Sequence, residues 1–367
     1  MEMDEVAIEK TREKIYTGLD NSKIAIERIL KEIAGDVDEI MFEMISDIES
    51  IELQEAAKHL VISGGKRARA VISLLSCEAV LGEPKFALPA AVSVEFIHTA
   101  SLVHDDIVDN NVTRRGRESV HVRWGVPIGV SVGNLLLAMA TKAMLDFAGH
   151  AAIQAPEEFT LTNMSKSAFY NASETLSMFS DAWVTLCQGK ETDSLLKRER
   201  YVTQDEVIKM IYQKTGILYE LAAKSGATAG NGSPEEIMGL KNYGGLMGIA
   251  FQIKDDILGL MADETEFGKH VGADIREGKK TVMVVHALNN GGDKNIILDA
   301  LGNINATSNQ ILQSIDAIKD AGSIDYAKRL AKSLGEQGEK SLDVLVASEA
   351  KESLLNISNY LISGRNW

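Results

Sequence analysis

Three aspartates end an otherwise apolar stretch, "SLVHDDIVDNNVTRRG", at residues 101–116. Asp105 and Asp109 are four residues apart, so on a helix they lie on one face. Two carboxylates that close repel each other unless a cation lies between them, and hard oxygen ligands suit magnesium. The alternative is a solvated helix end, but a helix C-terminus disfavours acids. The stretch therefore indicates a magnesium site, with Asp106 as its neighbour.

A second acidic pair, Asp255 and Asp256, ends the apolar stretch "FQIKDDILGLMAD", and Asp263 follows. Two apolar helices would thus each carry an acidic pair toward one end. If those ends meet, they frame a cleft lined with negative charge. Such a cleft needs several divalent cations, and the cations need an anionic ligand.

Basic residues are also grouped, and each group by itself has a simpler reading as solvated surface. They occur in "GGKRARA", "RRGR", "YQKTG" and "FGKHVGADIREGKK": Lys66, Arg67, Arg69, Arg114, Arg115, Arg117, Lys214, Lys269, Lys279 and Lys280. Gly64 and Gly65 would let backbone N–H groups approach a phosphate at a helix start. Arginine forks and lysine ammonium groups both bind phosphate oxygens. Acids for metals, bases for phosphates and an apolar interior together suggest a diphosphate that carries a hydrocarbon tail.

The composition favours helices to position these groups. The chain has 367 residues, 45% of them hydrophobic, with only 5 prolines and 5% aromatic residues. Apolar residues recur at three- and four-residue intervals, which predicts helices over about 85–110, 131–149 and 164–197. Thr203 and Glu206 form a capping signature that begins a further helix through "YQKTG". We expect an all-α protein, one large helical bundle.

No long linker divides the chain, so we expect a single domain over residues 1–367, with a motif core over about 60–290. The helices of about 295–367 are expected to be peripheral, with short additions near 150–165 and 303–309.

Charge and composition argue against several classes of protein. There are 38 basic and 53 acidic residues, a formal charge of −15, which argues against nucleic acid as a partner. The charged N-terminus is unlike a signal peptide. The uncharged run at 124–141 contains glycines and a proline, so we predict a loop followed by a buried helix and no stable membrane insertion. Two cysteines, Cys77 and Cys187, make no disulfide or metal pattern, which favours a cytoplasmic location.

The motifs "GGKRAR", "HTASLVHDDIVDNNVTRRG", "YQKTG" and "FQIKDDILG…GKHVGADIREGKKT" resemble, in order and spacing across about 64–288, the motif set of the trans-isoprenyl diphosphate synthases. The wording of the last motif resembles geranylgeranyl-type and longer-chain synthases. The resemblance implies the isoprenoid synthase fold with a central active-site cavity, a homodimer, and about three magnesium ions per active site. It also implies an enzyme that condenses isopentenyl diphosphate with an allylic diphosphate.

Roles carry over by position from this resemblance. The magnesium ligands would be Asp105, Asp106, Asp109, Asp255 and Asp256. The allylic diphosphate would be held by Arg114, Lys214 and Lys269. Isopentenyl diphosphate would be held by Lys66, Arg69, His98 and Arg115, with Lys279 as a further substrate contact. Thr215, Phe251 and Gln252 would line the path of the cation. Without the resemblance, His98 reads as an ordinary packed histidine.

Two positions depart from the family pattern. Lys190 in "QGKETD" stands where the family usually has glutamine, and Asn134 in "VGNLL" stands where it usually has aspartate. A buried ammonium would oppose a developing carbocation unless it contacts diphosphate or pairs with Glu191 or Asp193. Neither change removes an expected metal ligand, so both concern substrate preference more than reaction class.

The expected chemistry needs no side-chain nucleophile. Departure of the allylic diphosphate leaves a delocalised cation, which the double bond of isopentenyl diphosphate attacks, and proton loss restores a double bond. Two alternatives stay open: a class I terpene cyclase, which would usually carry a different second motif, and a catalytically silent partner subunit, which would usually lose a metal ligand or a diphosphate base.

The product length is expected to depend on the helix before the first aspartates. Short-chain members of the family often carry an aromatic residue five positions before the first metal ligand, where this chain has Ala100, followed by Ser101. The methyl group leaves room for a tail, with Ile97 as the next limit, so a product of about twenty carbons or longer is expected.

Overall fold

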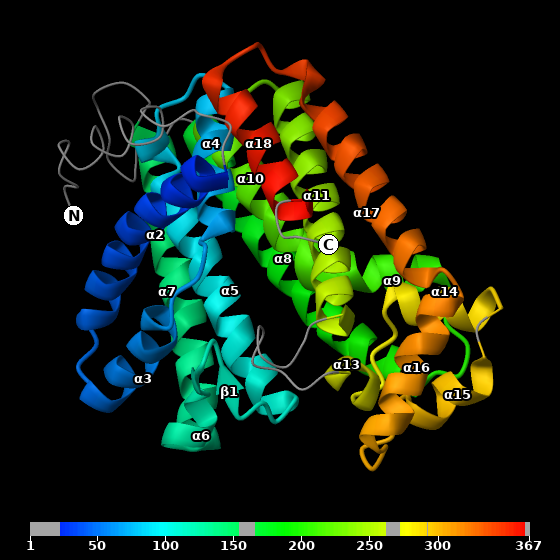
Figure 1. The fold of residues 1–367 in the computed structure, drawn as a ribbon. Coiled ribbons are helices and arrows are strands. Elements are labelled where there is room, and N and C mark those ends of the chain that lie inside the picture. Colours follow the sequence, from blue (N-terminus) through cyan, green and yellow to red (C-terminus); the bar gives the residue numbers. More distant parts are fainter. Residues whose placement is uncertain (1–22, 154–165, 262–271, 292, 364–367) are drawn as a thin grey trace. The chain divides into compact units, whose positions relative to one another are not determined.

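The computed structural model describes residues 23–153, 166–261, 272–291 and 293–363 (Figure 1). These residues are mainly helical, which confirms the predicted all-α class, and their only sheet is the two-stranded hairpin of β1 (Thr113–Arg114) and β2 (Arg117–Glu118). Contacts divide the chain into two compact units. Unit 1 comprises Met1–Asp181, Leu221–Lys241 and Leu342–Ile357, and unit 2 comprises Ala182–Glu220, Asn242–Ser341 and Ser358–Trp367. The single domain of the sequence analysis stays a prediction.

Unit 1 is built around α5 (Leu88–Val108). Its other elements are α2 (Lys23–Ser46), α3 (Ile51–Ile62), α4 (Ala68–Ala79), the 3-10 turn η1 (Pro84–Phe86), α6 (Val120–Trp124) and α7 (Val126–Ile153). In Figure 1, α5 and α7 run side by side, and α4 also packs on α5. Nearly every residue of α5 from Ala90 to Ala100 is buried, so this helix is covered on all sides, as a core helix should be.

Unit 2 contains the short helices around the C-terminal motifs. They are α9 (Gln204–Ile211), the π-helical turn η2 (Tyr212–Gly216), α13 (Ala273–Arg276), α14 (Val282–Asn289), α15 (Lys294–Ala300), α16 (Ser308–Asp320), α17 (Ser323–Lys340) and the start of η3 (Ser341–Val344). The helices α8 (Lys166–Arg198), α10 (Ile217–Ala229), α11 (Pro234–Met261) and α18 (Glu349–Ser363) each contribute residues to both units. The apolar core of unit 2 includes Ile253 and Ile257 of α11 and Val282–Val285 of α14.

The prediction of a loop before the helix α7 was wrong. After Gly125, α7 begins directly at Val126, with Pro127 in its first turn, where proline is tolerated. Gly129 and Gly133 lie in the helix and face α5: Cβ atoms there would lie 3.0 Å from the Cδ1 atom of Ile107 and 2.1 Å from the Nε2 atom of His104. They are there for close helix packing.

The same helix is also less buried than the sequence predicted. From Val126 to Leu145 it is long and apolar enough to span a membrane by length and composition, which alone is weak evidence, and 39% of it is buried. Val126, Val130 and Leu145 are exposed, as is Asn134. One side of α7 therefore carries apolar residues that unit 1 does not cover.

The helix predicted to run through "YQKTG" is interrupted. Thr203 and Glu206 form the predicted capping box, which confirms the start of α9. The five residues Tyr212–Gly216 then form a π-helical turn before α10. A turn of this kind holds one residue more than an α-turn and is frequent at functional sites.

Candidate active site

The first aspartate motif occupies the C-terminal end of α5. Asp109 is the C-cap residue, and its backbone N–H donates to the carbonyl oxygen of Asp105 at 2.8 Å. Asp105 and Asp109 are half-buried, whereas Asp106 is only 2% exposed. Asp106 accepts hydrogen bonds from the guanidinium of Arg114, at 3.0 Å from Nε and 2.5 Å from Nη2. The aspartates thus divide into a pair with magnesium-ligand spacing and one that holds an arginine.

The hairpin after this motif positions two arginines. Arg115 and Gly116 connect β1 to β2 and both have positive φ, 52° and 75°, as a type I′ turn requires. The Arg115 side chain donates to the carbonyl oxygen of Gly64. Burial and the nearby Arg67 lower the pKa of Arg115 to about 10. The "RRGR" segment is therefore a tight turn that brings the charged side chain of Arg115 to the "GGKR" segment, close to other arginines.

An arginine cluster surrounds His98 in unit 1; we use the name for Arg67, Arg69, Arg114 and Arg115. Burial, followed by the charges of all four, holds the pKa of His98 well below its usual range, so the imidazole is neutral. Lys66 and Arg69 are half-buried. Several guanidinium groups around one neutral, half-buried side chain make a site suited to an anion.

Arg67 is held by acids that the sequence analysis did not identify. It has a left-handed backbone conformation, and its side chain donates to Asp38 at 2.7 Å and lies 3.5 Å from Glu95. Asp38 is on α2 and Glu95 is on α5, far from Arg67 in sequence. No local pattern could reveal these partners.

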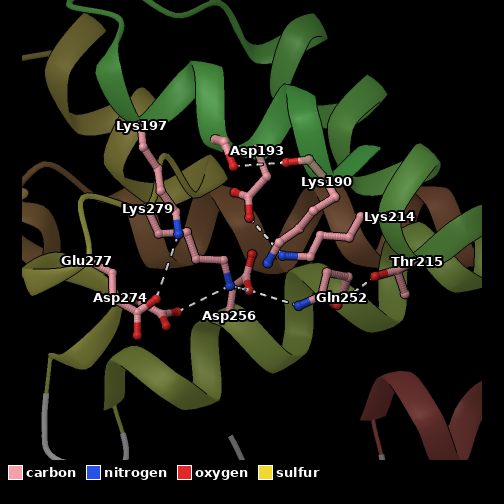
Figure 2. Close-up of polar contacts among 11 residues, drawn as sticks. Lys190, Asp193, Lys197, Lys214, Thr215, Gln252, Asp256, Asp274, Glu277 and Lys279 are labelled. Carbon is pink, nitrogen blue, oxygen red and sulfur yellow. Dashed lines mark hydrogen bonds and ion pairs between the residues drawn. The ribbon is translucent and has the colours of Figure 1, made fainter. Parts of the chain in front are cut away.

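In unit 2, a chain of polar contacts connects the YQKTG motif to the second aspartate motif (Figure 2). Thr215 donates to Gln252 at 2.9 Å, and Gln252 donates to Asp256 at 3.0 Å. The ammonium of Lys279 donates to Asp256 at 2.7 Å and to Asp274 at 3.4 Å. Residues that three separate motifs supply therefore form one connected network.

The Lys279 ammonium is a cation lying between two carboxylates. Burial lowers the pKa of Lys279, but the charges of Asp256 and Asp274 raise it by more. The net effect is a raised pKa, so the ammonium group stays charged. Asp274, in "GADIREGKK", was missed by the sequence analysis, and the short helix α13 brings it to this position. The predicted substrate contact of Lys279 stays a prediction, because its ammonium is here engaged by the two acids.

The YQKTG lysine is paired with α8. Lys214 donates to Asp193 at 2.7 Å, and Asp193 is only 3% exposed. Burial alone would raise the pKa of Asp193, but Lys214, with Lys197 and Lys279 farther away, holds it below its usual value. We call Lys190, Lys197, Lys214 and Lys279 the lysine cluster.

Among the described residues, the side chains that could bind a divalent metal ion lie in pairs and not in groups of three or more. No three histidine, cysteine or acidic side chains among them are grouped as a metal site. Asp256 and Asp274 nevertheless hold a cation between them, the Lys279 ammonium. Magnesium commonly binds through one or two carboxylates, water and substrate phosphates. The donor chemistry therefore fits magnesium.

The remaining predicted residues are placed as follows. Asp255 is half-buried on α11, and the ring of Phe251 packs against Tyr219 with centroids 5.7 Å apart. Ala100 and Ile97 are buried in α5, and the hydroxyl of Ser101 donates to the carbonyl oxygen of His98. Asp263 and Lys269 lie outside the described residues.

Comparisons with known proteins agree with these motifs. Residues 50–318 match the family model described as polyprenyl synthetase. A short chain isoprenyl diphosphate synthase of Methanothermobacter thermautotrophicus is 36% identical, over 91% of this chain and 97% of its own. A geranylgeranyl diphosphate synthase of Methanosarcina mazei is 34% identical, over 91% and 96%.

A solved structure extends the agreement to the fold. The crystal structure of geranylgeranyl pyrophosphate synthetase from Pyrococcus horikoshii is 37% identical, with a TM-score of 0.81 over 92% of this chain and 98% of that one. The predicted isoprenoid synthase fold is thereby confirmed. The chain therefore belongs to the polyprenyl synthetase family and is a prenyltransferase enzyme of that family.

Proposed function

We propose that this chain is a magnesium-dependent synthase that condenses isopentenyl diphosphate with an allylic diphosphate to make an all-trans product of about twenty carbons or longer. The observation that carries the proposal is chemical: the motif residues form two ion clusters, one rich in arginine and one in lysine, and each cluster is paired with a buried aspartate of a motif that carries predicted magnesium ligands. A reaction between two substrates that each carry a diphosphate requires two such cationic sites.

The chain's own residues divide the work of binding. Isopentenyl diphosphate would be held by Lys66, Arg69, His98 and Arg115, and the allylic diphosphate by Arg114, Lys214 and Lys269. Asp105, Asp109 and Asp255, with Asp106 and Asp256 beside them, would hold magnesium, which supplies charge neutralisation for the departing diphosphate.

Bond formation then needs orientation and exclusion of water. The allylic carbon–oxygen bond breaks, the isopentenyl double bond forms a new carbon–carbon bond, and the lost proton leaves with a diphosphate oxygen. Thr215 and Gln252 present hydroxyl and amide dipoles near the predicted cation path. The buried α5 would shield the growing hydrocarbon, since water would capture the cation as an alcohol.

A primer assay tests this function directly. The protein is incubated with magnesium, isopentenyl diphosphate and a set of allylic diphosphates, and the products are separated by chromatography. Condensation that chelator abolishes and magnesium restores is the expected result. A cyclised hydrocarbon would identify a class I terpene cyclase instead, and no turnover by folded protein would identify a silent subunit.

The proposal includes a cytoplasmic location and a homodimer. The homodimer is supported by the exposed apolar side of α7, where Val126 and Val130 are 50% and 41% exposed. Apolar residues on one helix face are typical of a surface that another chain covers. Sedimentation velocity of the wild type and of Val130→Glu measures it: a shift from dimer to monomer is expected, and a monomeric wild type contradicts it.

A further inference from the structure

Lys190 is the residue at which this chain departs from its family inside the lysine cluster, and its position is tightly determined. A Cβ atom at the preceding Gly189 would lie 2.7 Å from the backbone nitrogen of Lys214. Only glycine allows α8 to approach the π-helical turn this closely. The half-buried Lys190 therefore leaves α8 directly at the contact with the YQKTG motif.

The side chain of Lys190 points toward the Lys214–Asp193 pair (Figure 2). Lys190 and Asp193 are three residues apart on α8, so they lie on one face of the helix. Asp193 in turn accepts the hydrogen bond from Lys214 at 2.7 Å. Two lysine stems, from α8 and from the π-helical turn, thus converge beside one buried carboxylate.

Acids and lysines alternate along this region (Figure 2). Asp256 and Asp274 lie at one end, bridged by Lys279, and Glu277 lies 3.9 Å from Lys197. Lys190 and Lys214 lie at the other end, beside Asp193. Whatever acid each lysine contacts at rest, two ammonium groups at one end add a positive charge that the family's usual glutamine would not supply.

We propose that Lys190 is a second diphosphate-binding lysine of this chain, joining Lys214 on the diphosphate of the allylic substrate. This rests on the function proposed above. Diphosphate oxygens bind ammonium groups, and the two lysine stems that converge beside Asp193 supply two of them (Figure 2). The flexible stem of lysine lets the ammonium turn to the diphosphate and away from the cation path.

The first test is binding of inorganic diphosphate, with magnesium present, by titration calorimetry of the full-length protein. Lys190→Gln should weaken binding about tenfold, as expected for loss of one charge-assisted hydrogen bond, and Lys190→Arg should retain most of the affinity. Lys209→Gln is the matched control: it makes the same change at an exposed site on α9 and should bind as the wild type does.

Steady-state kinetics separates a binding role from a structural one. In Lys190→Gln the KM for the allylic diphosphate should rise about tenfold, while the KM for isopentenyl diphosphate stays unchanged. A purely structural role would lower the amount of active enzyme and leave both KM values unchanged.

The outcomes are distinct. The inference is overturned if Lys190→Gln binds diphosphate normally, whether or not Lys214→Gln loses affinity. If neither variant changes the affinity, the assignment of Lys214 in the proposed function falls as well. If Lys190→Gln weakens diphosphate binding but the wild type condenses no primer, the inference stands and the proposed reaction fails.

Discussion

The arginine cluster of unit 1 and the lysine cluster of unit 2 hold their cations in different ways. Arg114 is fixed by Asp106 through several hydrogen bonds at once, and Arg67 by a hydrogen bond to Asp38 and an ion pair with Glu95. Asp106 and Glu95 are almost fully buried. Lys214 and Lys279 are held through single ammonium groups.

The difference concerns preorganisation. A guanidinium fork fixes direction as well as distance, whereas an ammonium on a four-carbon stem can leave its carboxylate when a better anion arrives. Under the proposed function, unit 1 would hold one diphosphate in a set orientation. Unit 2 would exchange partners as diphosphate and metal enter and leave, which a departing group requires.

We expect the largest effect on activity, in either unit, from removing a carboxylate that is predicted to bind magnesium. Asp105→Ala in unit 1 and Asp255→Ala in unit 2 should each lower kcat by on the order of a hundredfold or more, because charge separation loses its stabilisation. Single-turnover rates at saturating magnesium measure this. Full activity in either variant would remove that residue from the mechanism.

The rigidity of the two clusters can be compared by exchanging their cations. Arg67→Lys keeps the charge but loses the contacts to both Asp38 and Glu95, so the free energy of unfolding should fall by about 1–2 kcal/mol. Lys214→Arg, opposite Asp193 at a partly exposed site, should change it by less than about 0.5 kcal/mol. Urea denaturation measures the free energy of unfolding of both variants. Equal losses would contradict the difference in rigidity between the two clusters.

The neutral His98 predicts a pH dependence specific to unit 1. Its pKa in the folded protein is well below the ordinary value of 6.5. As pH falls below that value, the unfolded chain binds a proton that the folded protein does not, so unfolding becomes easier by at most about 1.4 kcal/mol per pH unit. His98→Asn should show a shallower loss of stability between neutral and mildly acidic pH. If the free energy of unfolding depends on pH in the same way in both proteins, His98 does not cause the loss of stability.

The smallest expected change in rate, but a clear change in product, comes from Ala100→Phe. The tail is predicted to run along α5, where Ala100 is fully buried, and an aromatic ring would fill that space. The main product should lose at least one isoprene unit while the first condensation continues. Chromatography checks this, and an unchanged product distribution from a folded, active variant would show that the tail takes another route.

Local patterns predicted most of the helices and the grouped charges, because capping and apolar periodicity depend on neighbours in sequence. They failed where the cause lay elsewhere. Gly129 looked like a loop residue, but its close contact with Ile107 of another helix explains it. The ion partners Asp38 and Glu95 are distant from Arg67, and only the fold brings them together.

The π-helical turn carries a consequence for insertions and deletions. Since Tyr212–Gly216 accommodates one residue more than a regular helix would, deleting one residue there would let α9 continue smoothly into α10. The helix after the turn would keep about its present register, so Tyr219 would stay against the ring of Phe251. Within the turn the side chains would change direction, and Lys214 or Thr215 would leave its partner. We expect this short segment to tolerate many substitutions better than any change in its length.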